Sequence, residues 1–157
     1  GGQNVMIADS SAHAEQLVQD VVQSAFNSAG QRCSALRVLF IPEVIADQLS
    51  SRIIGVMQQL IIGDPQNYAT DIGPLISQNA VQQLTAHIAN MRKQARILFQ
   101  ATLPTNLASS YFFPPTLIEL SSLSLLATTI VATVNAPPTA HPTGPNPAKS
   151  APNILIS

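Results

Sequence analysis

The feature that most constrains this fold is an alternation of short apolar runs with longer segments of helical periodicity. The strand-like runs are residues 5–8, 36–41, 97–99 and 113–120. The helical segments, in which apolar residues recur every three or four positions, are residues 12–28, 43–61 and 78–94. Strands that alternate with helices are typical of α/β folds. We therefore expect an α/β fold with a mostly parallel sheet flanked by helices.

Polar residues and prolines indicate where several of these elements begin. Asp9, Ser10 and Ser11 can cap the first helix, and Ser77 can cap the third. Two consecutive prolines lie near the start of the 113–120 run, and proline cannot donate a hydrogen bond to a neighbouring strand. This last strand is therefore expected to lie at an edge of the sheet or to begin late.

The low charge of the chain bears on its partners. Only 10% of the 157 residues are charged and the net charge is -1, whereas about 25% of residues are charged in typical soluble domains. This suggests that other protein covers part of the surface, and the net charge gives no indication of binding to nucleic acid. No apolar run approaches the ~20 residues that span a bilayer, and one cysteine cannot form an internal disulfide. We expect a cytoplasmic protein without a membrane span.

The composition changes from about residue 121. Residues 121–157 contain one charged side chain, Lys149, and a proline-rich segment over 137–152 that cannot sustain a helix or a central strand. The change predicts a structured unit over residues 1–120 and a disordered tail over residues 121–157.

Cys33 is the residue that we single out as a reaction centre. A thiolate is a strong nucleophile, and this one follows a predicted helix end at Gly30, among small residues that leave room for a substrate. Arg32, its neighbour, can favour the thiolate electrostatically. A lone cysteine is more often a buried small hydrophobic residue or an inert thiol, so these residues alone leave all of these interpretations open. His13, His87 and His141 lack the spacing of metal ligands, and we expect no metal ion.

Four blocks of sequence resemble the aldehyde dehydrogenase family. The blocks are GGQNVMIADSSA at the start, GQRCSALRV around Cys33, IGDP with TDIGPLIS over 62–77, and FFPPTLIEL over 112–120. The second block resembles the Gly-Gln-x-Cys loop that carries the nucleophilic cysteine of that family. Four blocks in the same order are far more specific than one short motif. The chain is therefore identified as a member, which implies part of an aldehyde dehydrogenase catalytic domain.

The resemblance also implies a reaction and a set of site residues. The sequence around Cys33 is most similar to pyrroline-5-carboxylate dehydrogenases, which implies oxidation of L-glutamate 5-semialdehyde to L-glutamate with NAD in an oligomeric enzyme. It implies that Cys33 attacks the aldehyde, that Ser34 binds the substrate α-carboxylate and that Phe26 lines the aldehyde pocket. From the residues alone, Ser34 is equally well a loop-capping hydroxyl, and Phe26 a core residue.

Parts of the family pattern are not found in these 157 residues. The family's general base is a glutamate before the Gly-Gly pair, and its dinucleotide-binding domain also lies outside the matched blocks, so no cofactor-binding residue is assigned. The family's Glu-Val-Phe-Gly-Pro motif does not follow LIELSSLS, which suggests an out-of-frame tail. We therefore expect a fragment that is inactive alone. The alternatives are a fragment specific for another semialdehyde, or a non-catalytic, protein-binding or aggregation-prone remnant.

Overall fold

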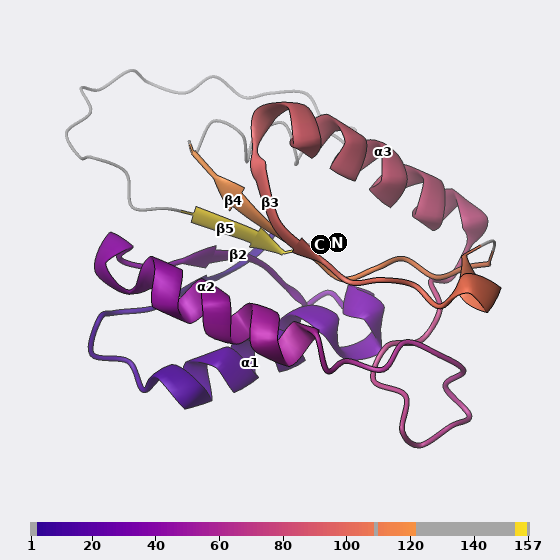
Figure 1. Ribbon diagram of the computed structural model, residues 1–157, viewed down its shortest axis with the longest axis horizontal. Helices are drawn as coiled ribbons and strands as arrows, with labels where there is room; N and C mark the ends of the chain where they lie inside the picture. The colour runs from indigo at the N-terminus through magenta and orange to yellow at the C-terminus, as the bar shows by residue number, and fades with distance from the viewer. Residues whose placement is uncertain (1–2, 109, 122–152, 157) are drawn as a thin grey trace.

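The computed structural model describes residues 3–108, 110–121 and 153–156 (Figure 1). The elements in chain order are β1 (Asn4–Ile7), α1 (Ala14–Phe26), the 3-10 turn η1 (Asn27–Gly30), β2 (Leu36–Phe40), α2 (Glu43–Met57), α3 (Gln78–Gln94), β3 (Arg96–Gln100), the 3-10 turn η2 (Thr105–Leu107), β4 (Thr116–Leu120) and β5 (Asn153–Ile156). Helices and strands alternate over the first half of the chain. The predicted α/β fold class is confirmed.

The sheet has the strand order β1-β2-β5-β4-β3. Only β1 and β2 pair in parallel, and the three other neighbouring pairs are antiparallel. The prediction of a mostly parallel sheet was therefore wrong. β1, β2 and β4 do run in one direction, but β5 lies between β2 and β4 and runs the opposite way. β3 is also reversed, because the segment that joins it to β4 carries no long crossover helix.

Helices cover both faces of the sheet. α1 and α2 lie together on one face and α3 lies on the other (Figure 1). The larger core lies under α1 and α2, where Val21, Leu39 and Ile53 are fully buried. A smaller cluster under α3 includes Met91 and Ile118. Burial of these apolar side chains is the main stabilising contribution to the fold.

Several element ends differ from the sequence prediction. α1 is capped by His13, whose Nδ1 accepts a hydrogen bond from the Gln16 N–H at 3.4 Å. The Asp9 carboxylate instead closes a local turn by accepting from Ser11. α2 ends at Met57 rather than near Ile61: the Gln59 and Leu60 N–H groups donate to carbonyls three residues back, and the Ile61 N–H donates to the Asp71 carboxylate at 2.8 Å. A tertiary hydrogen bond here replaces a helical one.

Other ends agree with the prediction. The Ser77 hydroxyl accepts from the Ala80 N–H at 3.2 Å and caps α3, which spans the predicted residues. β4 begins late, at Thr116, as the preceding prolines indicate. It is not an edge strand, however, because β3 and β5 flank it.

The predicted tail falls largely on residues 122–152, which lie outside the described residues. The prediction of disorder was wrong for Asn153–Ile156, which form β5. Two isoleucines and a leucine give this segment high strand propensity, and β2 and β4 both hydrogen-bond to it. Within the described residues no helix has the length and apolar character needed to cross a membrane.

Candidate active site

Cys33 lies on a turn between η1 and β2, and its side chain is exposed. The turn is at the edge of the sheet where β1 and β2 both begin, because Asn4 and Leu36 are register partners. Exposure excludes the interpretation of Cys33 as a buried core residue. An exposed thiol on a turn can be approached by a carbonyl compound from solvent.

The backbone before Cys33 adopts an uncommon conformation. Ser28, Ala29 and Gly30 all have left-handed φ angles, of 56°, 51° and 66°. For a residue other than glycine this conformation costs roughly 1–2 kcal/mol. Gly30 is required at its position, since an added Cβ would lie 2.9 Å from the Ala25 carbonyl oxygen. The half-buried Arg37 guanidinium donates to the Gly30 carbonyl, and burial lowers the pKa of Arg37.

Asn4 holds the Cys33 turn from the side of β1. Its Nδ2 donates to the carbonyl oxygens of Cys33 at 2.6 Å and of Ala35 at 3.0 Å. The parallel pairing of β1 with β2 places this amide beside the turn, 29 residues away along the chain. Asn4 therefore fixes the backbone on both sides of Ser34.

Gln31 holds the same turn from another direction. Its Nε2 donates to the Pro74 carbonyl at 3.1 Å and to the Ser28 carbonyl at 3.3 Å. Its Oε1 accepts from the Ile76 N–H at 2.7 Å. One exposed side chain thus links the Cys33 turn to the segment that precedes α3.

Ser34 and Phe26, the two predicted substrate-binding residues, occupy different environments. Ser34 is exposed and adjoins Cys33, so its hydroxyl is available to a ligand at the thiol. Phe26 is only 5% exposed and belongs to the core under α1 and α2. The groove that it lines does not include Cys33 or Ser34. Core packing is thus evident for Phe26, and its substrate contact stays a prediction.

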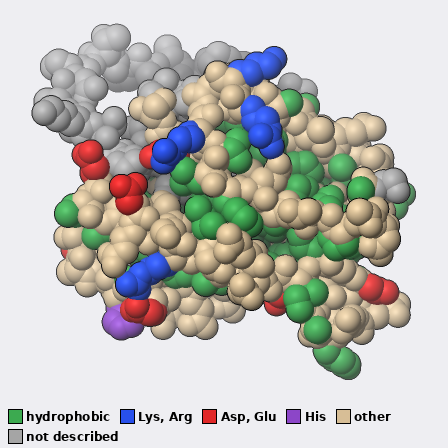
Figure 2. Space-filling view, in the orientation of Figure 1, with side chains coloured by type: hydrophobic (Ala, Val, Ile, Leu, Met, Phe, Trp, Pro, Cys, Tyr) green, Lys and Arg blue, Asp and Glu red, His purple; other side chains and the backbone are tan. Residues whose placement is uncertain are grey.

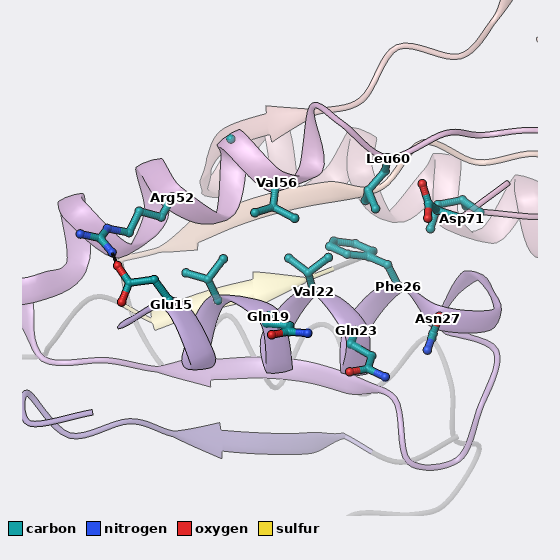
Figure 3. Close-up of a pocket in the computed structure, with 13 residues that line it drawn as sticks. Glu15, Gln19, Val22, Gln23, Phe26, Asn27, Arg52, Val56, Leu60 and Asp71 are labelled. Carbon is teal, nitrogen blue, oxygen red and sulfur yellow. Dashed lines mark hydrogen bonds and ion pairs between the residues drawn. The ribbon is translucent and has the colours of Figure 1, made fainter. Parts of the chain in front are cut away.

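A groove with a volume of about 820 Å³ lies between α1 and α2. Figure 3 shows Phe26, Val22 and Val56 facing its interior, with the Glu15–Arg52 ion pair at one end and Asp71 at the other. Figure 2 shows further apolar side chains along the middle of the visible face, between the α3 side and the α1–α2 side.

This groove does not suit a dinucleotide. A pyrophosphate needs N–H donors at a helix N-terminus or unpaired cationic groups. Here the only basic lining residue is Arg52, which Glu15 already pairs, and Asp71 adds a further negative charge. We therefore assign no role in cofactor binding to the residues that line this groove.

Three other ionisable residues, His87, Arg96 and Glu119, pack within the fold or pair with one another. His87 is half-buried in α3, and burial lowers its pKa. Arg96 and Glu119 form an ion pair at 2.6 Å across β3 and β4. The described part of the chain contains no group of three or more potential ligands that could hold a metal ion.

The site is thus an exposed thiol on a turn of an α/β sheet, held by side-chain hydrogen bonds from Asn4 and Gln31. The sequence pattern of the aldehyde dehydrogenase family matches residues 1–128. The chain belongs to the aldehyde dehydrogenase family.

Curated relatives agree with this assignment. The bifunctional protein PutA of Klebsiella aerogenes is 46% identical over 131 residues, which cover 80% of this chain but 10% of that protein. The 1-pyrroline-5-carboxylate dehydrogenase of Geobacillus kaustophilus is 37% identical over 98 residues, which cover 62% of this chain and 19% of that protein. The chain therefore spans only a small part of the length of these relatives.

Solved structures show the same likeness. A mutant of Bradyrhizobium japonicum proline utilization A superposes with a TM-score of 0.75 at 46% identity, covering 80% of this chain and 12% of that one. The methylmalonate-semialdehyde dehydrogenase of Oceanimonas doudoroffii gives 0.70 at 30% identity, covering 75% and 25%. The described fold is that of part of an aldehyde dehydrogenase.

Sequence reasoning missed the residues that hold the turn. Asn4 and Gln31 lie within the blocks that resemble the family, but neither was assigned a contact. Their partners lie 29 to 45 residues away in the chain. The available signal for Asn4 was its position at the start of one strand, beside the predicted start of the next. No periodicity indicates the partners of Gln31.

Proposed function

We propose that Cys33 is the nucleophile of an enzyme that oxidises L-glutamate 5-semialdehyde to L-glutamate, with NAD as the hydride acceptor. The observation that carries this proposal is the exposed thiol on a turn that Asn4 and Gln31 hold from two sides. The names of the relatives PutA and 1-pyrroline-5-carboxylate dehydrogenase support the substrate.

The chemistry assigned to this chain is formation of a covalent adduct. The Cys33 thiolate attacks the aldehyde carbon, a carbon–sulfur bond forms, and the carbonyl oxygen takes up a proton to give a thiohemiacetal. The Ser34 hydroxyl, on the same turn, donates a hydrogen bond to the α-carboxylate of the substrate. An aldehyde without that carboxylate would leave this contact unused.

The isolated chain is expected to form this adduct without turning over. Oxidation and hydrolysis of the adduct need a bound hydride acceptor and a general base, and no described residue is assigned to either role. Mixing the purified chain with the semialdehyde and NAD should give no steady increase in absorbance from NADH. Steady turnover would contradict this part of the proposal.

The role of Ser34 has its own test. In Ser34→Ala, affinity for the semialdehyde should fall about tenfold because a hydrogen bond to a charged group is lost. Affinity for an uncharged aldehyde of similar length should not change. Ser10→Ala, which alters an exposed serine outside the site, is the matched control. Equal effects of Ser34→Ala on both aldehydes would remove the carboxylate contact from the proposal.

A second candidate function is association with another protein. β1 is an edge strand, and its Val5 and Ile7 side chains are 50% and 79% exposed. An apolar edge is a surface on which another chain can pack. Sedimentation of the chain should then show assemblies that Ile7→Lys disperses. A monomer at all concentrations would exclude self-association of the chain through this edge.

A further inference from the structure

We propose that Gln31 is a positioning residue that couples the Cys33 turn to the 74–76 segment. The inference rests on the proposed function of Cys33, because a nucleophilic sulfur must be held at a suitable distance and orientation relative to the carbonyl carbon. Gln31 does not touch the substrate in this account. It acts through the backbone that carries the thiol.

Both polar atoms of the Gln31 side-chain amide form hydrogen bonds. The Nε2 donates to the carbonyls of Ser28 and Pro74, and the Oε1 accepts from the Ile76 N–H. The 74–76 segment is itself anchored, since Leu75 is buried and its N–H donates to the Tyr111 carbonyl at 2.7 Å. Gln31 therefore ties the turn to a part of the chain that is fixed independently.

The turn needs such a tie because its backbone is strained. Two of the three left-handed residues before Gln31 carry side chains, which favours relaxation to an ordinary conformation. The Ser28 carbonyl accepts from both the backbone N–H and the side-chain Nε2 of Gln31. On the other side, Asn4 fixes the Cys33 and Ala35 carbonyls. Without Gln31 the turn would be held by side chains of β1 and β2 alone, Asn4 and Arg37, and would lose its connection to the 74–76 segment.

Only an amide of this length satisfies all three partners. Asparagine is one methylene shorter and would lose its reach to the 74–76 segment. A glutamate carboxylate can still accept from the Ile76 N–H, but it cannot donate to the two carbonyl oxygens. Gln31→Glu should therefore keep the hydrogen bond from Ile76 and lose the hydrogen bonds to Ser28 and Pro74.

Amide hydrogen exchange measured residue by residue in the full chain tests the coupling. In Gln31→Ala, exchange at Ile76 should accelerate about tenfold because its acceptor is lost. Exchange at Ala35, whose N–H donates to the Arg32 carbonyl within the Cys33 turn, should accelerate by a similar factor. In Gln31→Glu, Ile76 should stay protected while Ala35 accelerates. Gln82→Ala, an exposed glutamine on α3, should change neither amide.

The rate of adduct formation at Cys33 completes the test. It should fall at least threefold in Gln31→Ala when both chains are compared at a temperature at which each is folded. An unchanged Ala35 amide would overturn the coupling, and an unchanged adduct rate alongside faster exchange would overturn the positioning role. If Cys33 forms no adduct even in the unsubstituted chain, the proposed function fails. The exchange data then still test whether Gln31 couples the Cys33 turn to the 74–76 segment.

Discussion

The Cys33 turn and the core under α1 and α2 are held by different forces. The turn is exposed and depends on hydrogen bonds from Asn4, Gln31 and Arg37 to backbone carbonyls. The core is buried and depends on the packing of apolar side chains such as Leu39 and Ile53. The difference indicates that substitutions in the core should cost the fold more stability than substitutions around the turn, and that only those around the turn should change the reactivity of the thiol.

The largest effect is expected in the core. Phe26→Ala removes a buried aromatic ring and leaves a cavity, so the free energy of unfolding should fall by about 3–5 kcal/mol. Urea unfolding followed by circular dichroism measures this loss. Tyr68→Ala, at a fully exposed aromatic residue, should change the free energy by less than about 0.5 kcal/mol. A small effect of Phe26→Ala would show that Phe26 lines a ligand site rather than supporting the core.

The next effect belongs to the backbone before the thiol. Gly30→Ala places a Cβ against the Ala25 carbonyl at a left-handed φ, so the fold should lose about 1–3 kcal/mol. Gly55→Ala is the matched control, because nothing lies near its added Cβ and alanine favours the α2 helix. Urea unfolding should show destabilisation by the first change and stabilisation by the second. Equal effects at both glycines would contradict the strained conformation of the turn.

A smaller loss is expected from the β1 side of the turn. Asn4→Ala removes two hydrogen bonds to backbone carbonyls, and the fold should lose about 1–2 kcal/mol. Asn79→Ala, on the exposed surface of α3, is the control. The alkylation rate of Cys33, the only cysteine in the chain, should change in Asn4→Ala and not in Asn79→Ala. Identical rates would show that Asn4 does not hold the thiol.

The smallest effect concerns the exposed Glu15–Arg52 ion pair, which joins α1 to α2. The pKa of Glu15 is lowered, first by a hydrogen bond from its own backbone N–H and then by the Arg52 guanidinium. A lowered carboxylate pKa stabilises the fold above the ordinary pKa and loses that contribution as the pH falls. In Glu15→Gln, the melting temperature should therefore fall less steeply with acidification below about pH 5. An unchanged slope would exclude this contribution.

The same contrast explains what the sequence could predict. Apolar periodicity located α1, α2, α3 and the strands β1, β2, β3 and β4, because burial leaves a regular pattern in one dimension. The antiparallel pairing of β2 and β4 with β5 could not be predicted from the sequence, since β5 comes from the segment expected to be disordered. The family motif located Cys33, but the residues that hold it are polar and distant in sequence. Such contacts leave no periodic signal, so Asn4 and Gln31 were found only from the coordinates.

Carbon-13 NMR of the chain mixed with L-glutamate 5-semialdehyde, labelled at the aldehyde carbon, tests most directly whether Cys33 is a nucleophile. If Cys33 is the nucleophile, a new signal should arise from a tetrahedral carbon bonded to sulfur, and Cys33→Ala should abolish it. Absence of that signal from the unsubstituted chain, or its persistence in Cys33→Ala, would show that Cys33 is not the nucleophile.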